Sequence, residues 1–163
     1  MAKQLYTIGY SRWSGANRLE KMVAELRDHN ITLLVDVRLS PAASSLSEES
    51  IYGPKAWSLQ PAGRGIESHL NAAGIGYLWL SELGNPQKND PSHTIMQQHI
   101  LESDEPWPVH RGLKLLYDKI ESGERVALLC TCATYETCHR KQVAEALKDL
   151  YYHSDLEIQN ITD

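Results

Sequence analysis

The segment from Cys130 to Arg140 carries the densest group of reactive side chains in the chain. Three cysteines, Cys130, Cys132 and Cys138, fall within nine residues and are followed directly by His139 and Arg140. A thiolate is a nucleophile and a metal ligand, an imidazole exchanges protons near neutral pH, and a guanidinium binds anions. The segment therefore predicts thiol chemistry, anion binding or metal binding.

A helix beginning in this segment would strengthen the first two of these chemistries. We predict a helix over Thr137–Leu150 with Thr137 as its N-cap, which places Cys138 at its first position. The positive end of a helix attracts anions and lowers the pKa of a nearby thiol. On this interpretation Cys138 is a nucleophile or redox thiol, His139 exchanges protons, and Arg140 binds an anion.

Two other interpretations of the same residues stay open. The pattern C-x-C-x5-C-H offers a metal ion four ligands, Cys130, Cys132, Cys138 and His139, although its spacing differs from that of common zinc fingers. Alternatively, Cys130 ends the apolar run VALLC and is a packing residue, because unpaired cysteines are among the most buried residue types.

Other polar residues follow the predicted strands. Asp36 interrupts the end of the apolar run ITLLVDV, and a buried carboxylate there needs partners. Arg38 lies on the same strand face and is a candidate for local pairing or ligand binding. Tyr10 and Ser11 follow the first predicted strand. The carboxyl ends of parallel strands form the usual ligand-binding edge of a sheet, so we expect these residues to line it together.

Alternating apolar runs predict the elements that position these residues. The predicted strands are Gln4–Gly9, Ile31–Val37, Ile75–Leu80, Arg125–Cys130 and Leu156–Ile161. The predicted helices are one that follows a cap at Ser14 and ends near Asn30, then Ala62–Ala73, His93–Glu102, Val109–Ser122 and Thr137–Leu150. A long loop is expected over about 38–61. This order indicates an α/β fold: residues 1–163 as one three-layer domain, with a mainly parallel sheet of about five strands and helices on both faces.

Composition narrows the class of protein. The net charge of −5 and the pI near 5.8 argue against a duplex-DNA partner. No apolar run reaches the roughly 20 residues that a membrane helix needs, so no membrane association is expected. Clustered cysteines are unlike a secreted disulfide framework, and together with the lack of an apolar leader they predict a cytoplasmic protein.

Four motifs resemble one known family. YTIGYS, LVDVRLSP, GIGYLWLSELG and LLCTCATYETCHR are together similar to the motifs of a bacterial and archaeal family catalogued as domain of unknown function 488 (DUF488), whose reaction is not established. The resemblance implies an α/β fold and singles out the matching positions Asp36, Arg38, Cys130, Cys138, His139 and Arg140. Tyr10 stands where that family usually has histidine, and Cys132 where it often has an acid. These departures point to a changed substrate or to loss of the ancestral activity.

Three functions are compatible with these patterns. The first is a small enzyme, or an enzyme-like pocket, that holds a small anion such as phosphate or a nucleotide. In it Cys138, His139 and Asp36 do the chemistry, and Arg38, Arg140, Tyr10 and Ser11 bind the ligand. The second is a non-catalytic binding or regulatory module in which the polar residues brace loops. The third is a Cys/His metal protein. The sequence does not indicate a cofactor, an oligomeric state or whether the chain is an enzyme.

Overall fold

Five parallel strands form the centre of the molecule. The computed structural model describes residues 3–9, 18–37, 66–80, 83, 108–130 and 135–161. In this part of the chain the strands are β1 (Lys3–Gly9), β2 (Leu33–Asp36), β3 (Gly76–Trp79), β4 (Val126–Cys130) and β5 (Leu156–Asn160). They pair in the order β3-β2-β4-β1-β5. Each pair is parallel, which confirms the predicted sheet.

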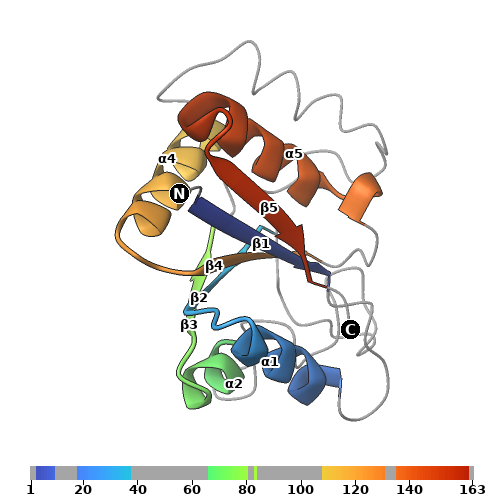
Figure 1. Cartoon of the computed structure of the whole chain (residues 1–163). Coiled ribbons are helices and arrows are strands. Elements are labelled where there is room, and N and C mark those ends of the chain that lie inside the picture. The colour runs from blue at the N-terminus through green and yellow to red at the C-terminus, as the bar shows by residue number, and fades with distance from the viewer. Residues whose placement is uncertain are drawn as a thin grey trace.

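Helices cover both faces of this sheet (Figure 1). They are α1 (Arg18–Asp28), α2 (Ile66–Ala72), α4 (Pro108–Glu121) and α5 (His139–Leu147), the last continued by a π-helix, η5 (Lys148–Tyr152). The connections from β1 to β2 and from β2 to β3 run in one direction along the sheet, and the later ones run back. Since parallel crossovers are right-handed, α1 and α2 cover one face and α4 and α5 the other. The three predicted layers are confirmed.

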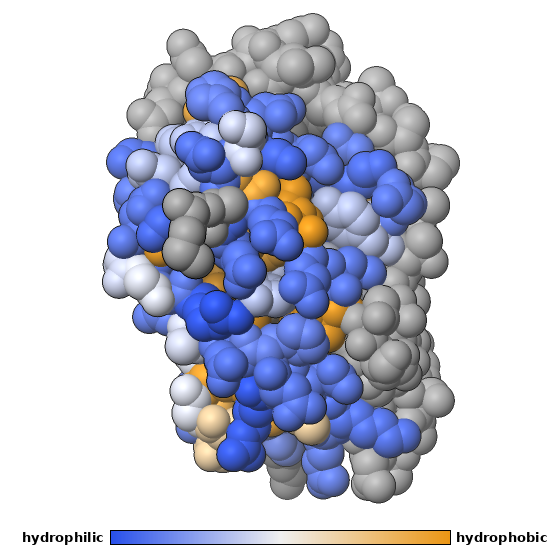
Figure 2. Space-filling model, in the orientation of Figure 1, coloured by the Kyte–Doolittle hydropathy of each residue, from blue (hydrophilic) through white to orange (hydrophobic). Residues whose placement is uncertain are grey.

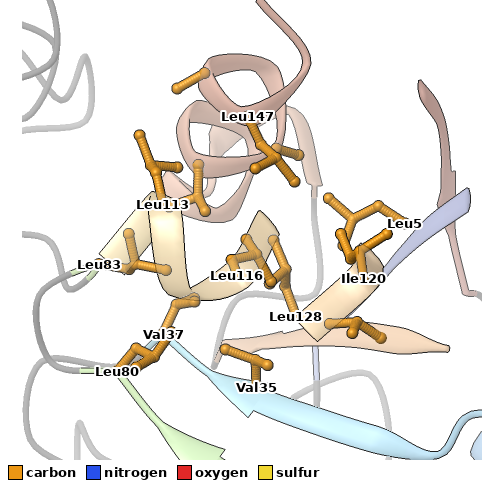
Figure 3. Packing of buried hydrophobic residues seen from close by; sticks show 14 of the residues in the cluster. Leu5, Val35, Val37, Leu80, Leu83, Leu113, Leu116, Ile120, Leu128 and Leu147 are labelled. Atoms are coloured by element: carbon orange, nitrogen blue, oxygen red, sulfur yellow. The ribbon is translucent and has the colours of Figure 1, made fainter. Parts of the chain in front are cut away.

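Each helical layer has its own hydrophobic core. On one side α1 and α2 contribute Met22, Leu26 and Leu70 to a cluster with Leu34 and Leu129 of the sheet. The other cluster is larger and lies between the sheet and the pair α4 and α5. Figure 3 shows Leu113 and Leu116 of α4 and Leu147 of α5 above Val35 and Leu128. Alternate residues of β2 and β4 therefore enter different cores, as expected for strands buried on both faces.

Hydrophilic side chains cover most of one face of the molecule (Figure 2). On the face turned to the viewer in Figure 2, hydrophilic residues predominate and the hydrophobic areas are small and separate. Within the described ranges, no helix is both long and apolar enough to cross a membrane. The predicted loop over 38–61, the predicted helix His93–Glu102 and the proposed cap at Ser14 lie outside the described residues.

Candidate functional site

The carboxyl end of β4 is the centre of the candidate site. β4 lies between β2 and β1, and both of these strands lead to helices on the α1–α2 face. β4 itself leads to α5 on the opposite face (Figure 1). On each side of β4, neighbouring strands therefore lead to helices on opposite faces of the sheet. Such switch points open a crevice beyond the strand ends, where parallel α/β proteins bind ligands. Cys130 is the last residue of β4.

Cys130 is paired with an imidazole in a fixed orientation. The Nε2 atom of His139 lies 2.7 Å from the carbonyl oxygen of Val37. A carbonyl oxygen only accepts hydrogen bonds, so Nε2 carries the proton and donates it. In the neutral ring, Nδ1 is then unprotonated, and it lies 3.6 Å from the Sγ atom of Cys130. The backbone of the neighbouring strand thus holds the imidazole with its lone pair directed at a thiol.

Cys138 is the N-cap of α5, which corrects the predicted start of this helix. Tyr135–Thr137 forms a short 3-10 turn, and α5 begins at His139. Thr137 is therefore not the cap. Cys138 takes that position with extended backbone angles and makes no side-chain capping hydrogen bond. The predicted helix Thr137–Leu150 is α5 followed by the π-helical segment η5.

The structure brings three of the predicted groups together. The Sγ atoms of Cys130 and Cys138 and a ring nitrogen of His139 all lie within 4.8 Å of one another. All three residues are buried, with exposed fractions of 5%, 1% and 6%. Both cysteines are reduced thiols. We refer to these three residues as the Cys-Cys-His cluster.

Arg140 lies next to this cluster and is completely buried. Its Nη2 atom donates a hydrogen bond of 3.3 Å to Oδ1 of Asn160 on β5, and the same oxygen accepts one from Thr7 of β1 at 2.8 Å. Its guanidinium carbon also lies 5.7 Å from the centre of the Tyr135 ring. A buried cation is costly unless polar groups surround it, so these contacts make Arg140 part of the packing between α5 and the sheet.

Tyr135 remains uncharged beside this arginine. Burial, followed by the nearby Glu145 and Glu136 carboxylates, raises the pKa of Tyr135 to about 12. The positive charge of Arg140 acts in the opposite direction but does not offset them. At neutral pH the ring is a neutral phenol, and its face is available to the guanidinium.

Asp36 belongs to the opposite face of the sheet. Its carboxylate is fully buried and accepts a hydrogen bond of 2.5 Å from the Tyr77 hydroxyl of β3. Side chains alternate along a strand, so Asp36 shares a face with Leu34 in the α1–α2 core, whereas Val37 and Cys130 enter the α4–α5 core. The structure therefore separates Asp36 from the Cys-Cys-His cluster, with which the sequence grouped it.

Four other predicted site residues, Arg38, Tyr10, Ser11 and Cys132, lie outside the described residues. Conversely, the structure adds Tyr77, Asn160 and Thr7 as partners of the buried charges. Thr7 could have been noticed in the sequence, since it is a polar residue between the apolar Tyr6 and Ile8 of β1, whereas Asn160 is one of several polar residues in β5. Tyr77 gave no such signal, because tyrosine is common in strands.

The described part of the chain also contains a shallow surface cavity of about 270 Å³ over α1 and α2. It is lined by Glu20, Val23, Ala24, Arg27 and His69. None of these residues belongs to the predicted site, so the cavity does not extend the Cys-Cys-His cluster.

The fold and this cluster define a small α/β protein with a buried thiol and imidazole group at the carboxyl end of its central strand. The family model described as domain of unknown function DUF488 matches residues 55–147, which is more than half of the chain. The chain belongs to this family. No curated protein and no solved structure matches it.

Proposed function

We propose that this protein is a small enzyme-like protein that binds a small anion, such as phosphate or a mononucleotide, beyond the carboxyl end of β4. One observation carries the proposal: Cys130, Cys138 and His139 converge at the switch point of the sheet, where α5 begins, and Arg140 follows them in the first turn of that helix. The amino end of α5 and the charge of Arg140 both favour negative charge at that position.

The residues have different roles in this proposal. Cys138 and His139 belong to the reactive group, with Cys130 added because its thiol is the one paired with the imidazole. Arg140 supplies positive charge from behind the site, since its guanidinium is buried against Asn160. Direct contact with the anion is assigned to Arg38, which follows β2 in sequence, with Tyr10 and Ser11 after β1.

Asp36 has a supporting role. Because its carboxylate points to the other face and accepts a hydrogen bond from Tyr77, it ties the end of β2 to the neighbouring strand β3. Clustered cysteines and a net charge of −5 fit a protein of the cytoplasm that acts on small molecules and not on duplex DNA.

Thermal unfolding with millimolar phosphate, at constant ionic strength, tests anion binding. A ligand that binds only the folded state raises the melting temperature with its concentration. We expect this shift in the wild type and in the matched control Arg27→Ala, whose arginine is exposed on α1. Arg38→Ala should lose the shift, and Arg38→Lys should recover only part of it, because lysine lacks the bidentate fork. An equal shift in Arg38→Ala would contradict the proposal.

A non-catalytic module is the second candidate, and the complete burial of both Asp36 and Arg140 favours it. In such a protein these charges only brace the fold. Arg140→Ala would then destabilise the unliganded protein, and neither phosphate nor a mononucleotide would raise its melting temperature or that of the wild type. A specific phosphate shift in the wild type that Arg38→Ala removes would exclude this candidate.

A further inference from the structure

We infer that the Cys-Cys-His cluster is a zinc site in which Cys130, Cys138 and His139 are three of the ligands. No other described residue belongs to this group, and we refer to the fourth coordination position as the open position. The inference rests on the proposed function in one respect: the open position is where the anion would bind. It starts from the position of the three ligand atoms, which lie within 4.8 Å of one another.

The dimensions of the cluster match those of a zinc site. Zinc–sulfur bonds of about 2.3 Å and zinc–nitrogen bonds of about 2.0 Å at tetrahedral angles place sulfur about 3.5 Å from nitrogen and the two sulfurs about 3.8 Å apart. The observed distance from Cys130 Sγ to His139 Nδ1 is 3.6 Å. With no ligand pair beyond 4.8 Å, the remaining distances need to close by about 1.3 Å at most.

The surroundings of His139 are those of a metal ligand. A metal-binding histidine almost always donates its second ring N–H to a carboxylate or a backbone carbonyl, which fixes the tautomer and directs the other nitrogen at the metal. His139 does this with Val37 at 2.7 Å. This contact leaves Nδ1 as the ring nitrogen that faces the Cys130 thiol, as a metal ligand requires.

The ligand types and their burial select the metal. Two thiolates and one imidazole suit zinc, whereas magnesium and calcium prefer oxygen ligands. The charges of two thiolates cancel that of Zn²⁺, so the complex can be buried without the cost of an isolated charge. Two cysteines and one histidine with an open position form a known ligand set of catalytic zinc.

The binding reaction balances simply. In the metal-free protein the Cys130 S–H group donates a hydrogen bond to His139 Nδ1 and keeps its proton. When Zn²⁺ enters, two S–H bonds break, two S–Zn bonds and one N–Zn bond form, and both protons pass to the buffer. No oxidant or reductant takes part.

Titration of chelator-treated, tag-free protein with zinc against a chromophoric competitor tests the inference. We expect one zinc per chain. Cys130→Ser, Cys138→Ser and His139→Gln should each weaken binding by more than about 100-fold, beyond the loss typical of residues outside the ligand set. His153→Gln is the matched control, because His153 is exposed. Cobalt, used as a spectroscopic substitute, should show a thiolate charge-transfer band that either serine variant reduces.

A second measurement needs only the wild type and so does not depend on the folding of a variant. Zinc should slow the alkylation of Cys130 and Cys138 together, as read by peptide mass spectrometry, and excess chelator should restore their original rates. Zinc binding that survives in Cys130→Ser and His139→Gln would overturn the inference. Alkylation rates of Cys130 and Cys138 that zinc leaves unchanged would also overturn it.

Phosphate-dependent melting of the zinc-loaded and zinc-free wild type separates this inference from the proposed function. Zinc binding without any phosphate shift leaves the metal site standing and removes the anion pocket. A phosphate-dependent rise in melting temperature in a protein that binds no zinc supports the anion pocket and rules out the metal site. A phosphate shift that is larger in the zinc-loaded protein supports both, with the anion at the open position.

Discussion

At the residue scale, Asp36 and Arg140, the two fully buried charged residues in the described part of the chain, have different surroundings. Asp36 accepts a hydrogen bond from a tyrosine hydroxyl in the α1–α2 core, and Arg140 donates one to an asparagine beneath α5. They lie on opposite faces of the same sheet, so each is stabilised by neighbours of its own. Substitutions of the two residues should therefore affect stability independently.

Asp36→Ala should lower the free energy of unfolding by about 1–3 kcal/mol, because the Tyr77 hydroxyl then loses its acceptor in a buried site. Asp36→Asn should cost less, since the amide oxygen can still accept that hydrogen bond. Urea denaturation measures both variants. Glu157→Ala, an exposed acidic position on β5, is the control. Wild-type stability in Asp36→Ala would show that the carboxylate does not support the fold.

Tyr135→Phe should change stability little at neutral pH, because among the described residues the buried Tyr135 hydroxyl has no hydrogen-bond partner. The difference should appear at high pH. The pKa of Tyr135 is raised from 10.0 to about 12, so the neutral phenol stabilises the folded state. That contribution is present below about pH 10 and is lost as the pH rises toward 12.

Urea denaturation of the wild type and Tyr135→Phe between pH 7 and about pH 11 measures this difference. The wild type should lose stability more steeply above pH 10 than the variant does. The variant should still lose some stability at high pH, because burial also raises the pKa of Tyr152. Parallel pH profiles for the two proteins would contradict the assignment.

At the scale of single elements, the start of α5 is unusual because a cysteine occupies the N-cap. Serine, threonine, asparagine and aspartate cap helices well, and their oxygens accept hydrogen bonds from backbone N–H groups of the first turn. Cys138 makes no such bond. A residue that caps poorly at this position is consistent with selection for a thiol and not for helix stability.

Substitutions of Cys138 separate its role as the N-cap of α5 from its role as a zinc ligand. In the zinc-free protein, Cys138→Ser should be more stable than Cys138→Ala by about 1 kcal/mol, because the serine hydroxyl can cap α5 and alanine cannot. Both variants should lack the zinc binding of the wild type. Chemical denaturation with chelator present gives the stability difference. Equal stability of the two variants would show that the position gains nothing from a capping oxygen.

The elements themselves were largely predictable from the sequence, because buried parallel strands are continuous apolar runs and helices repeat every three to four residues. The strand order was not, since the sequence does not state which strands pair. The N-cap of α5 was misplaced by one residue, at Thr137 instead of Cys138, because threonine is the better cap.

The candidate site was predictable only in part. Cys130, Cys138 and His139 are close in sequence, and their convergence follows from a strand that leads directly into a helix. The pairing of His139 with Cys130 depends on the Val37 carbonyl, a backbone group that no sequence motif marks. The separation of Asp36 depends on which face each helix covers, and this follows from strand order alone.

At the scale of the whole molecule, one sheet carries two cores. The α1–α2 core contains Leu70, and the α4–α5 core contains Leu116. Both cores use side chains from β2 and β4. Loss of either helical layer would therefore expose one face of strands on which the other core also depends. The molecule should therefore unfold as one unit despite its two cores.

Leu70→Ala and Leu116→Ala test this cooperativity. Both side chains are completely buried, so each substitution should cost about 2–5 kcal/mol. Because the sheet is shared, far-ultraviolet and near-ultraviolet circular dichroism should report the same midpoint in urea for each variant. Separate midpoints in Leu70→Ala would show that the α1–α2 layer can melt alone.

The central position of β4 has a consequence for synthesis of the chain. β1 and β2 are not neighbours; each reaches the rest of the sheet through β4, and β2 can otherwise pair only with β3. While the ribosome is still making the first three strands, β1 has no partner to join. The nascent chain must therefore carry the apolar strand β1 unpaired until Val126–Cys130 emerges, and exposed segments of this kind are what chaperones bind.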